Sequence, residues 1–482
     1  MQLATIADET RLALATLAER AAGIVAPSLR LGVTGLARAG KTVFITALVH
    51  NLIHGGRLPL FKAYSGGRVS GAELEPQPDD DVPRFDYEQH VRDLVDARIW
   101  PASTRRISEL RLAIHYESAS FLNRSLGRGR LNLDIVDYPG EWLLDLPLLG
   151  KDYSTWSREA IAFARAPARI GLAERWLRRA EAVPADGRED ETVARELAAL
   201  FTEYLRACRA SDHAATEPPG RFLMPGDLDG SPALTFAPLA APERSPPGSL
   251  GAMMARRYAA YKDAVVRPFF RDHFARLDRQ IVLVDALEAL NAGPAALADL
   301  EAALAAILAS YRVGRAGWLT GLIARRIDRI LFAATKADHL HHGDHDRLEA
   351  ILGKLVERAR ERARFAGAQV EVLALASVRA TREGTVTRRG EQLPSIIGTP
   401  LPGEKLDGRI FDGAGEIAMF PGDLPDKPET ASENAGTGAL AELRFLRFRP
   451  PKLEQTAEGL SLSLPHIRLD RALEFLIGDR LA

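Results

Sequence analysis

The stretch Gly35-Leu-Ala-Arg-Ala-Gly40-Lys41-Thr42 matches the phosphate-binding loop G-x-x-x-x-G-K-[ST] at every fixed position. The apolar residues 29–34 before it predict a short buried strand, and the apolar residues 43–49 after it predict a helix. A strand, a glycine-bounded loop and a helix N-terminus form an anion site, because backbone N–H groups and the positive end of the helix dipole converge there. In such a loop Lys41 contacts the β- and γ-phosphates, and the Thr42 hydroxyl binds Mg²⁺. The sequence therefore predicts a nucleotide-binding site at this loop.

Composition indicates a soluble globular protein, since the chain of 482 residues has 46% hydrophobic residues and a mean hydropathy of −0.11. This length allows about three domains. Its 63 basic residues nearly cancel its 64 acidic ones, so no global charge attracts nucleic acid or an anionic membrane. The single cysteine, Cys208, cannot form an internal disulfide, which is typical of a reducing compartment. No apolar run is long enough to span a membrane and no signal peptide is visible, so we expect a cytoplasmic protein.

The order of the expected elements indicates an α/β protein with a mostly parallel sheet and helices on both faces, because strands and helices alternate on both sides of a helical stretch. The helical stretch reads as a domain inserted into the α/β domain. A small β-rich region and a terminal helix close the chain. The five expected regions are an N-terminal helix at 1–26, the first α/β part at 27–141, the helical insertion at 142–278, the second α/β part at 279–380, and the C-terminal region at 381–482.

Two later motifs distinguish GTP from ATP. Asp137-Tyr-Pro-Gly140 follows an apolar strand, where an aspartate can reach Mg²⁺ through a water and a glycine N–H can contact a γ-phosphate. Thr335-Lys336-Ala-Asp338 follows another apolar strand and matches [NT]-K-x-D. Its aspartate can accept hydrogen bonds from guanine N1–H and N2–H₂, and adenine lacks donors at those positions. Together the motifs predict binding of GTP or GDP with Mg²⁺.

The remaining site residues follow from these motifs. We expect Thr104, just before the second strand, to sense the γ-phosphate and Mg²⁺, with Ser103 as its substitute. The predicted metal ligands are Thr42, Thr104 and Asp137. The predicted nucleotide contacts are Gly35, Arg38, Ala39, Gly40, Lys41, Thr42, Val43, Thr335, Lys336, Asp338, Ser377 and Val378. The predicted catalytic residues are Lys41, Thr104, Gly140, Glu141 and Arg38.

Residues 32–46, 100–104, 137–144 and 335–340 resemble the YcjX family of bacterial, stress-associated GTP-binding proteins, and the similarity runs over nearly the whole chain. The resemblance implies a Ras-like G domain with large additions, GTP hydrolysis, and a setting in envelope or heat-stress responses. It also implies a protein effector or a membrane-protein partner as options, with peripheral attachment at the inner membrane. Nucleic acid is not expected as a partner.

Glu141 complicates catalysis, because many small GTPases have a water-orienting glutamine at that position after D-x-x-G. A carboxylate beside a triphosphate is repelled unless it is protonated or paired. Either Glu141 points away or it serves as an unusual base, and Arg38 is the nearest cation in sequence that could compensate. We therefore expect slow hydrolysis. A P-loop ATPase or kinase, and a nucleotide-binding scaffold with negligible turnover, remain alternatives.

Two further runs are rich in functional residue types. Residues 338–346 contain four histidines and three aspartates, but this density is also typical of a polar loop that caps the next helix. Residues 444–452 interleave arginines with phenylalanines, which favours an edge strand with a charged face over a nucleic-acid or lipid surface. We assign no function to either run from the sequence.

Overall fold

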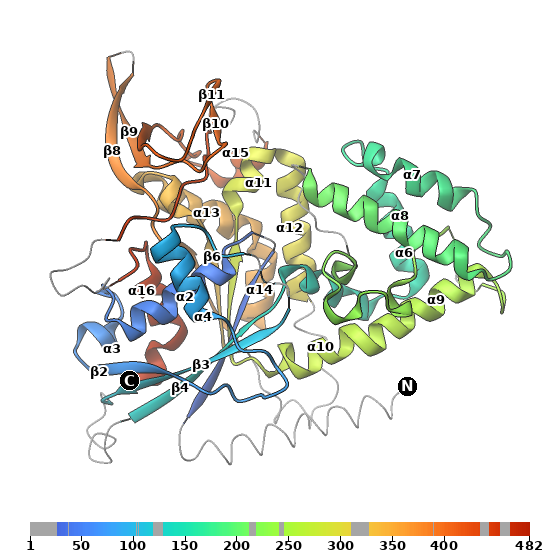
Figure 1. Ribbon diagram of the computed structural model, residues 1–482, viewed down its shortest axis with the longest axis horizontal. Helices are drawn as coiled ribbons and strands as arrows, with labels where there is room; N and C mark the ends of the chain where they lie inside the picture. The colour runs from blue at the N-terminus through green and yellow to red at the C-terminus, as the bar shows by residue number, and fades with distance from the viewer. Residues whose placement is uncertain are drawn as a thin grey trace. The chain divides into compact units, whose positions relative to one another are not determined.

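The structure is a computed structural model that describes residues 27–36, 38–102, 104, 106–118, 129–211, 218–240, 245–309, 327–388, 390–433, 443–453 and 463–482. The expected N-terminal helix at 1–26 lies outside these residues, as does Ser103. The described chain forms two compact units. The sheet unit contains 27–138, Leu277–Leu297 and 327–482, and the helical unit contains 139–276 and 298–309. Figure 1 labels the elements of both units.

The sheet unit contains a seven-stranded sheet in the order β2-β3-β4-β1-β5-β6-β7. Neighbouring strands from β4 through β1, β5 and β6 to β7 are parallel, and β3 pairs antiparallel with both β2 and β4. The expected fold class, α/β with a mostly parallel sheet, is therefore confirmed. The strands are β1 (Ser28–Gly35), β2 (Val69–Glu75), β3 (Ser108–Tyr116), β4 (Gly129–Asp137), β5 (Arg279–Val284), β6 (Arg329–Ala334) and β7 (Gln369–Ala374).

The central strands are apolar runs because both faces of the sheet are covered. Every residue of β5 is buried, and only the first residue of β1 and of β6 is partly exposed. On one face, α2 (Lys41–Ile53) and α16 (Leu469–Ile477) share a core with side chains of these strands, for example Leu31, Leu283 and Leu331. The terminal helix thus packs on the central sheet and not with the small β-rich region.

Other helices of the sheet unit connect the strands. Between β5 and β6 lie α11 (Ala286–Ala292) and the beginning of α12 (Pro294–Ala309), and between β6 and β7 lie α13 (His345–Leu355) and α14 (Glu357–Phe365). Right-handed crossovers between parallel strands place such helices on the face opposite α2 and α16. The remaining short elements are α3 (Lys62–Ser65), α4 (Tyr87–Arg92) and the π-helical turn η1 (Asp93–Ala97).

The C-terminal β-rich region has its own small core. One sheet has the order β12-β9-β8, and a separate ladder pairs β10 with β11. The strands are β8 (Arg382–Arg388), β9 (Glu391–Gly398), β10 (Lys405–Leu406), β11 (Arg409–Ile410) and β12 (Ile417–Met419), followed by α15 (Pro428–Glu433). In the basic and aromatic run, Phe448 is buried in this core, while Arg444 pairs with Asp407 and Arg447 with Glu404. The run is therefore engaged in local ion pairs.

The helical unit is held by an aromatic core. Trp156, Trp176, Phe201, Tyr258 and Tyr261 are all nearly fully buried within it. Its helices are η2 (Gly140–Gly150), α6 (Tyr153–Ala164), α7 (Ile170–Glu181), α8 (Glu191–Ala210), α9 (Leu250–Tyr261), η6 (Lys262–Val266) and α10 (Arg267–Asp272), with short turns η3 (Gly220–Phe222), η4 (Gly226–Leu228), η5 (Pro232–Leu234) and η7 (Phe274–Arg276). None of the described residues between 139 and 276 contributes a strand to the central sheet.

Several details differ from the expectations. The glycines, prolines and acidic residues at 55–84 indicate a long loop, but this stretch contains α3 and the edge strand β2. The helical unit begins at Pro139 and ends at Arg276, where the sequence indicated 142–278, and it also includes residues 298–309 of α12. Gly127 and Gly129 indicate a turn at 117–130, and most of that stretch lies outside the described residues. In the part of the chain that is described, no helix is both long enough and apolar enough to cross a membrane.

Candidate functional site

The predicted site residues of the sheet unit lie at one edge of the sheet. Val33 pairs with Asp137 on one side and with Ile281 on the other, so β4, β1 and β5 end close together. The ladders between β5, β6 and β7 continue in step to Val284, Ala334 and Ala374. In open α/β sheets, ligands bind at the carboxyl ends of the parallel strands. The phosphate loop, Asp137 and the T-K-x-D motif all follow strand ends at this edge.

Glycines at the two ends of the phosphate loop meet different requirements. A Cβ on Gly35 would lie 2.7 Å from the backbone oxygen of Leu283, so only glycine allows the loop to leave β1 this close to β5. Gly40 has a φ of 87°, a left-handed conformation that glycine adopts without strain, and it precedes the first residue of α2. Arg38 also has a positive φ, of 64°, and its side chain is exposed. The loop therefore has the backbone turn that its motif predicts.

Lys41 lies over the phosphate loop. Its Nζ donates to the backbone oxygen of Gly35 at 3.0 Å and to that of Leu36 at 3.5 Å, and the residue is 8% exposed. The ammonium group is thus held at the N-terminus of α2, beside the N–H groups of the first helical turn. A phosphate at this helix end would meet both the ammonium charge and the backbone donors.

Three predicted metal ligands are joined by hydrogen bonds. The Thr104 hydroxyl donates to Asp137 Oδ2 at 2.6 Å, and the Thr42 and Thr104 hydroxyl oxygens are 3.2 Å apart. Because the single Thr104 hydroxyl hydrogen is used by Asp137, Thr42 donates to Thr104. Asp137 Oδ1 is buried and has no hydrogen-bond partner among the described residues. Burial raises the pKa of Asp137 to about 6, although Lys41 and the Thr104 hydrogen bond oppose the shift.

This arrangement fits a hydrated divalent cation. Hydroxyl and carboxylate oxygens are the ligands that Mg²⁺ prefers, and Mg²⁺ retains several of its waters in nucleotide sites. A metal-bound water would donate to Asp137 Oδ1, which otherwise remains a buried acceptor without a donor. The structure therefore brings Thr42, Thr104 and Asp137 together in a way that is suitable for Mg²⁺.

Tyr138, the residue after Asp137, is fixed to the sheet. Its hydroxyl lies 2.5 Å from the Thr34 hydroxyl, and Gln280 Nε2 donates to both the Tyr138 and the Thr34 oxygens. Thr34 and Gln280 come from β1 and β5, so the network joins three segments in the interior of the unit. The first two residues of Asp137-Tyr-Pro-Gly140 are therefore rigid parts of the sheet unit.

Asp338 is held in a defined orientation. It is 4% exposed, its Oδ2 accepts the Ala380 N–H at 2.8 Å, and its backbone oxygen accepts the Thr381 hydroxyl. Asp338 Oδ1 accepts no hydrogen bond from the described residues, so one oxygen is anchored and the other is left for a ligand. A desolvated carboxylate with one anchored oxygen is suited to reading paired N–H donors.

A second acidic group supports the T-K-x-D loop. The Lys336 Nζ pairs with Asp285, the residue after β5, and Asp285 is nearly buried. Lys336 has a left-handed backbone with a φ of 59°. Burial lowers the pKa of Lys336, but the neighbouring carboxylates raise it more, so the pKa lies above its ordinary value. Glu288 lies in the same charge cluster, where burial raises its pKa while Lys336 and Arg38 lower it. These contacts link the Lys336 loop to the end of β5.

The other predicted nucleotide-binding residues lie near the T-K-x-D loop or in and beside the phosphate loop. Thr335 is buried and its N–H and hydroxyl both donate to the Val284 oxygen. Ser377 and Val378 follow β7 in a loop that is fixed by a two-way backbone pairing of Ala376 with Ile467. Arg38, Ala39 and Val43 stay within the phosphate loop and the first turn of α2.

Gly140 and Glu141 belong to the helical unit. The boundary between the units falls after Tyr138, inside the D-x-x-G motif. Glu141 is 5% exposed, and its Oε1 pairs with Arg209 of α8 at 2.8 Å. The carboxylate of Glu141 is therefore paired. Pairing, like protonation, is a condition under which a carboxylate is tolerated beside a triphosphate.

The segment η2 after Gly140 is locked into the helical core. Asp145 is 2% exposed and accepts the Gly220 N–H at 2.7 Å and the Tyr261 hydroxyl at 2.7 Å. The Trp142 indole donates to the Met224 oxygen, and a Cβ on Gly220 would overlap the backbone of Glu141. Sequence reasoning missed these partners because they lie more than 70 residues further along the chain.

Two other contributors were missed by the sequence. Asp285 is an acidic residue at the tip of a buried strand on the same edge as Asp137, and this shared pattern was the available signal. Ala380 acts through its backbone N–H, which any residue type other than proline supplies. No side-chain pattern could have identified it.

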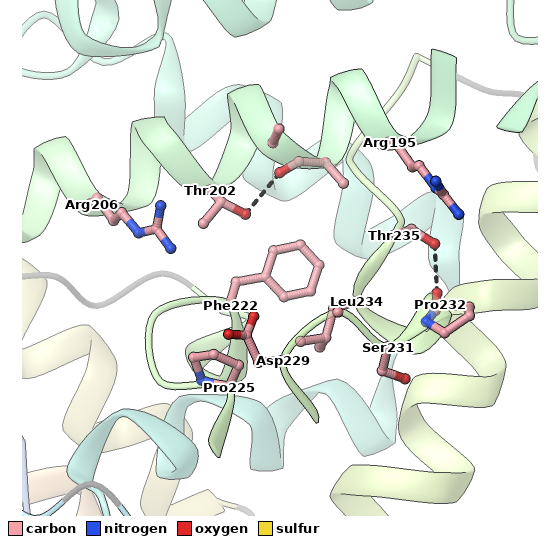
Figure 2. Close-up of a pocket in the computed structure, with 13 residues that line it drawn as sticks. Arg195, Thr202, Arg206, Phe222, Pro225, Asp229, Ser231, Pro232, Leu234 and Thr235 are labelled. Atoms are coloured by element: carbon pink, nitrogen blue, oxygen red, sulfur yellow. Dashed lines mark hydrogen bonds between the residues drawn. The ribbon is translucent and has the colours of Figure 1, made fainter. Parts of the chain in front are cut away.

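The helical unit also contains a groove with a volume of about 420 Å³. Figure 2 shows Arg195, Thr202 and Arg206 along α8 on one side and Phe222 and Leu234 on the other. Arg195 pairs with Glu191, and the Thr202 hydroxyl donates to its own helix at Ala198. The drawn residues lack a nucleophile beside a base, so the chemistry of the chain is better explained at the sheet edge.

Comparison with known proteins agrees with the motifs. The model of the YcjX-like family, DUF463, matches residues 29–481. A protein named Ras-like GTPase YcjX from Escherichia coli (strain K12) is 38% identical over 466 residues, which cover 94% of this chain and 96% of the relative. A protein of the same name from Shewanella oneidensis (strain MR-1) is 35% identical over 480 residues, which cover 94% of each chain. The chain belongs to the YcjX-like family.

Proposed function

We propose that the chain binds GTP and GDP with Mg²⁺, hydrolyses GTP slowly to GDP, and acts as a nucleotide-dependent switch. The observation that carries the proposal is the hydrogen-bonded set Thr42, Thr104 and Asp137 beside Lys41, with one buried Asp137 oxygen that lacks a donor. When bound, Mg²⁺ would neutralise charge on the phosphates, and Thr42 and Thr104 would hold it. The names of the relatives support the same assignment.

Phosphate binding relies on preorganised donors. Lys41 stabilises negative charge on the β- and γ-phosphates, and the N–H groups at the start of α2 bind the phosphate oxygens without rearrangement. Arg38 is exposed within the loop and is available to a transferring phosphoryl group. Positioning and charge stabilisation of this kind account for most of the catalysis in phosphoryl transfer.

Selection of guanine over adenine is assigned to Asp338. Its anchored oxygen faces the Ala380 N–H, so the other oxygen and the remaining lone pairs accept from guanine N1–H and N2–H₂. Adenine offers no donors there and would leave a buried carboxylate unpaired. A P-loop ATPase or kinase that uses the same phosphate loop would not need this carboxylate.

The test is the variant Asp338→Asn. Its amide oxygen can keep the Ala380 hydrogen bond, which turns the NH₂ group toward the base and against guanine's own donors. Xanthine has a carbonyl where guanine has the amine, so we expect the variant to prefer xanthosine triphosphate over GTP by about 2–4 kcal/mol. Affinities of parent and variant are measured by titration with GTP, xanthosine triphosphate and ATP.

Asp346→Asn is the matched control for this test. Asp346 lies eight positions further along, its side chain is 88% exposed, and it pairs with Arg468. We expect this control to keep the parent's preference for GTP. If Asp338→Asn also keeps that preference, Asp338 does not read the base and the assignment to GTP loses its main support.

Slow turnover is supported by the pairing of Glu141 with Arg209. A general base must accept a proton from the attacking water, and an ion pair with arginine directs the carboxylate at the guanidinium and away from such a water. The same pairing favours a second candidate function, a scaffold that binds GTP or GDP and hardly hydrolyses it. Single-turnover phosphate release separates the two, because a scaffold releases no phosphate above the uncatalysed rate.

The switch role is supported by the division of D-x-x-G between the two units. Tyr138 is fixed in the sheet unit, and Glu141 and Asp145 are fixed in the helical unit. If Gly140 contacts a γ-phosphate, as its motif predicts, the first residues of the helical unit sense the nucleotide directly. A nucleotide state would then be transmitted to the helical unit without an intermediate element.

A cellular setting in envelope or heat stress, in the cytoplasm or at the inner membrane beside a membrane-protein partner, is part of the same proposal. It depends on the family resemblance and on no individual residue. Growth of a strain without the gene under heat and envelope stress tests it, together with complementation by the Lys41→Ala variant. Complementation by that variant would separate the stress role from nucleotide binding.

A further inference from the structure

We propose that His341, His342 and Glu383 form a binding site for a divalent transition-metal ion of the Zn²⁺ class. One nitrogen of each histidine and one oxygen of the glutamate lie within 4.8 Å of one another. The site is separate from the nucleotide ligands, and the proposal does not depend on GTP binding. Among the described residues it is the one group of three such side chains.

The distances between the histidine nitrogens and the Glu383 oxygen fit a metal site in which, without an ion, the ligands hydrogen-bond to each other. His342 Nδ1 lies 2.8 Å from Glu383 Oε2, and His341 Nε2 lies 3.8 Å from the same oxygen. Ligands at about 2.0–2.2 Å from one metal ion are about 3–3.5 Å from each other. Both observed distances are therefore within a few tenths of an ångström of those in an occupied site.

The geometry of the two histidines is set by the start of the turn η11 (His342–Asp344). Their ring centroids are 4.1 Å apart, so both rings lie on the same side of the loop. The Gly343 N–H donates to His341 Nδ1 at a long 3.4 Å, which leaves His341 Nε2 directed at Glu383. When His341 binds a metal through Nε2, the ring proton sits on Nδ1, which then cannot accept the Gly343 N–H. Because this hydrogen bond is long, its loss costs little.

The carboxylate is also oriented in advance. Arg379 lies 3.5 Å from Glu383 Oε1, while both histidines face Oε2. The arginine therefore fixes the oxygen that does not bind the metal, a role that outer partners commonly have at metal sites.

The other candidate ligands of the run at 338–346 contact other groups, and the His339 ring packs edge-on against Phe448. His345 Nε2 bonds the Ala337 oxygen at 3.0 Å, Asp344 pairs with Arg347, and Asp346 pairs with Arg468. Asp338 accepts the Ala380 N–H. Of this run only His341 and His342 face a carboxylate from a distant segment, the beginning of β8.

The donor set selects the class of ion. Two imidazoles and one carboxylate suit Zn²⁺, Co²⁺ or Ni²⁺, whereas Mg²⁺ and Ca²⁺ prefer oxygen ligands alone. The side chains of His341 and His342 are 22% and 66% exposed, so waters can complete the coordination and the ion can exchange with solvent. A site of this kind takes up an ion reversibly and is not required for folding.

The two segments that the ion would join are those that hold Asp338. The loop with the histidines follows Asp338 directly, and Glu383 lies two residues after Thr381, whose hydroxyl donates to the Asp338 backbone. An ion at this site would add a connection between the loop and the β-rich region, next to the bonds from Ala380 and Thr381.

The test is a titration of the full-length protein, without a histidine tag and freed of metal by chelation, with Zn²⁺ and Co²⁺. An excess of Mg²⁺ in the buffer occupies the oxygen ligands of the nucleotide loop. We expect one equivalent of Zn²⁺ by calorimetry, and visible absorption from Co²⁺ with nitrogen ligands. The variants His341→Gln and Glu383→Gln should each bind at least about tenfold more weakly.

His115→Gln is the matched control. His115 also faces a single carboxylate, Glu73, at 3.0 Å on an exposed surface, but it lacks a second histidine. The control should bind Zn²⁺ as the parent does. The proposal is overturned if the parent takes up no Zn²⁺, or if Glu383→Gln and His115→Gln bind Zn²⁺ with the same affinity as the parent. Circular dichroism of each variant establishes that weaker binding does not come from unfolding.

Discussion

Asp137 and Asp338 are both buried carboxylates at the same edge of the sheet, but their oxygens have different surroundings. Asp137 accepts from Thr104 with Oδ2 and has a buried Oδ1 without a partner among the described residues, whereas Asp338 accepts from Ala380 with Oδ2. A buried acceptor without a donor costs free energy, and a metal-bound water removes that cost at Asp137. The same residue type thus supports a cation at one position and base recognition at the other.

Lys41→Ala tests the phosphate site at the level of one side chain. The variant removes an ammonium group that bonds two loop oxygens, and it leaves the apolar core unchanged. We expect the affinity for GDP to fall by about 1.5–3 kcal/mol, the range for a hydrogen bond to a charged group. The measurement is a calorimetric titration, with Lys62→Ala as control because that lysine side chain is 81% exposed. An affinity within about twofold of the parent would contradict the predicted role of Lys41.

Asp145 predicts a pH dependence in the helical unit. Burial raises its pKa to about 6, while bonds from Tyr261 and Gly220 oppose the shift, and an unfolded aspartate has a pKa of about 3.9. The folded unit therefore holds a proton that the unfolded chain releases between these values. Below about pH 4 the group has no effect, and as pH rises to about 6 the free energy of unfolding falls by about 3 kcal/mol.

Asp145→Asn removes this titration. We expect the free energy of unfolding of the parent to fall by about 3 kcal/mol more than that of the variant between about pH 4 and pH 6.5. Urea unfolding followed by circular dichroism at several pH values measures the difference, in which the contributions of other groups cancel. Parallel pH profiles of the two proteins would show that the buried carboxylate does not titrate as its surroundings predict.

At the scale of elements, the sequence predicted those parts whose signals are local. The parallel strands are continuous apolar runs, and the phosphate loop and T-K-x-D follow them at fixed spacing. The edge strand β2 was missed because none of its residues is fully buried and it contains Gly71, so it has neither an apolar run nor a clear alternation. The ion-pair partner of Glu141, Arg209, was missed because only the folded chain brings these distant helices together.

Arg209→Ala tests the contact between η2 and α8. Glu141 is nearly buried, so removing its partner leaves a charge without compensation. Because the Arg209 side chain is 29% exposed, water relieves part of the cost, and we expect a loss of about 1–3 kcal/mol in the free energy of unfolding.

The matched control is Arg206→Ala, one turn earlier on α8 (Figure 2). Arg206 is exposed at the groove, and a surface substitution of this kind changes stability by less than about 0.5 kcal/mol. In the double variant Arg209→Ala with Glu141→Gln, the buried charge is gone and part of the stability should return. Equal effects of Arg206→Ala and Arg209→Ala in chemical unfolding would show that the ion pair does not hold η2.

At the scale of the whole molecule, each unit is closed by segments distant in sequence. In the sheet unit, the fully buried Arg279 at the start of β5 bonds Asp328, Asp479 and the Leu476 oxygen, which fastens the C-terminal helix to the sheet. In the helical unit, Arg169 pairs with Asp299, which belongs to the second segment of that unit. Neither unit is therefore a contiguous stretch of chain. The chain passes from one unit to the other inside D-x-x-G, after Arg276 and within α12.

The division of D-x-x-G predicts that the two units respond differently to nucleotides. GDP contacts are expected in the sheet unit alone, whereas a γ-phosphate is expected to engage Gly140, the second residue of the helical unit. A ligand stabilises the structure that it binds, by about 2.7 kcal/mol at a concentration one hundred times its Kd.

We therefore expect GDP to slow hydrogen exchange in β1 and α2 but not in α8 and α9, and a non-hydrolysable GTP analogue to slow it in all four elements. Hydrogen–deuterium exchange with mass spectrometry resolves these peptides, and Gly140→Pro, which removes the backbone N–H, should abolish the additional protection of α8 and α9 while GDP still protects β1 and α2. Equal protection of the helical unit by GDP and by the GTP analogue would mean that Gly140 does not report the γ-phosphate, and the switch would then have to act elsewhere in the chain.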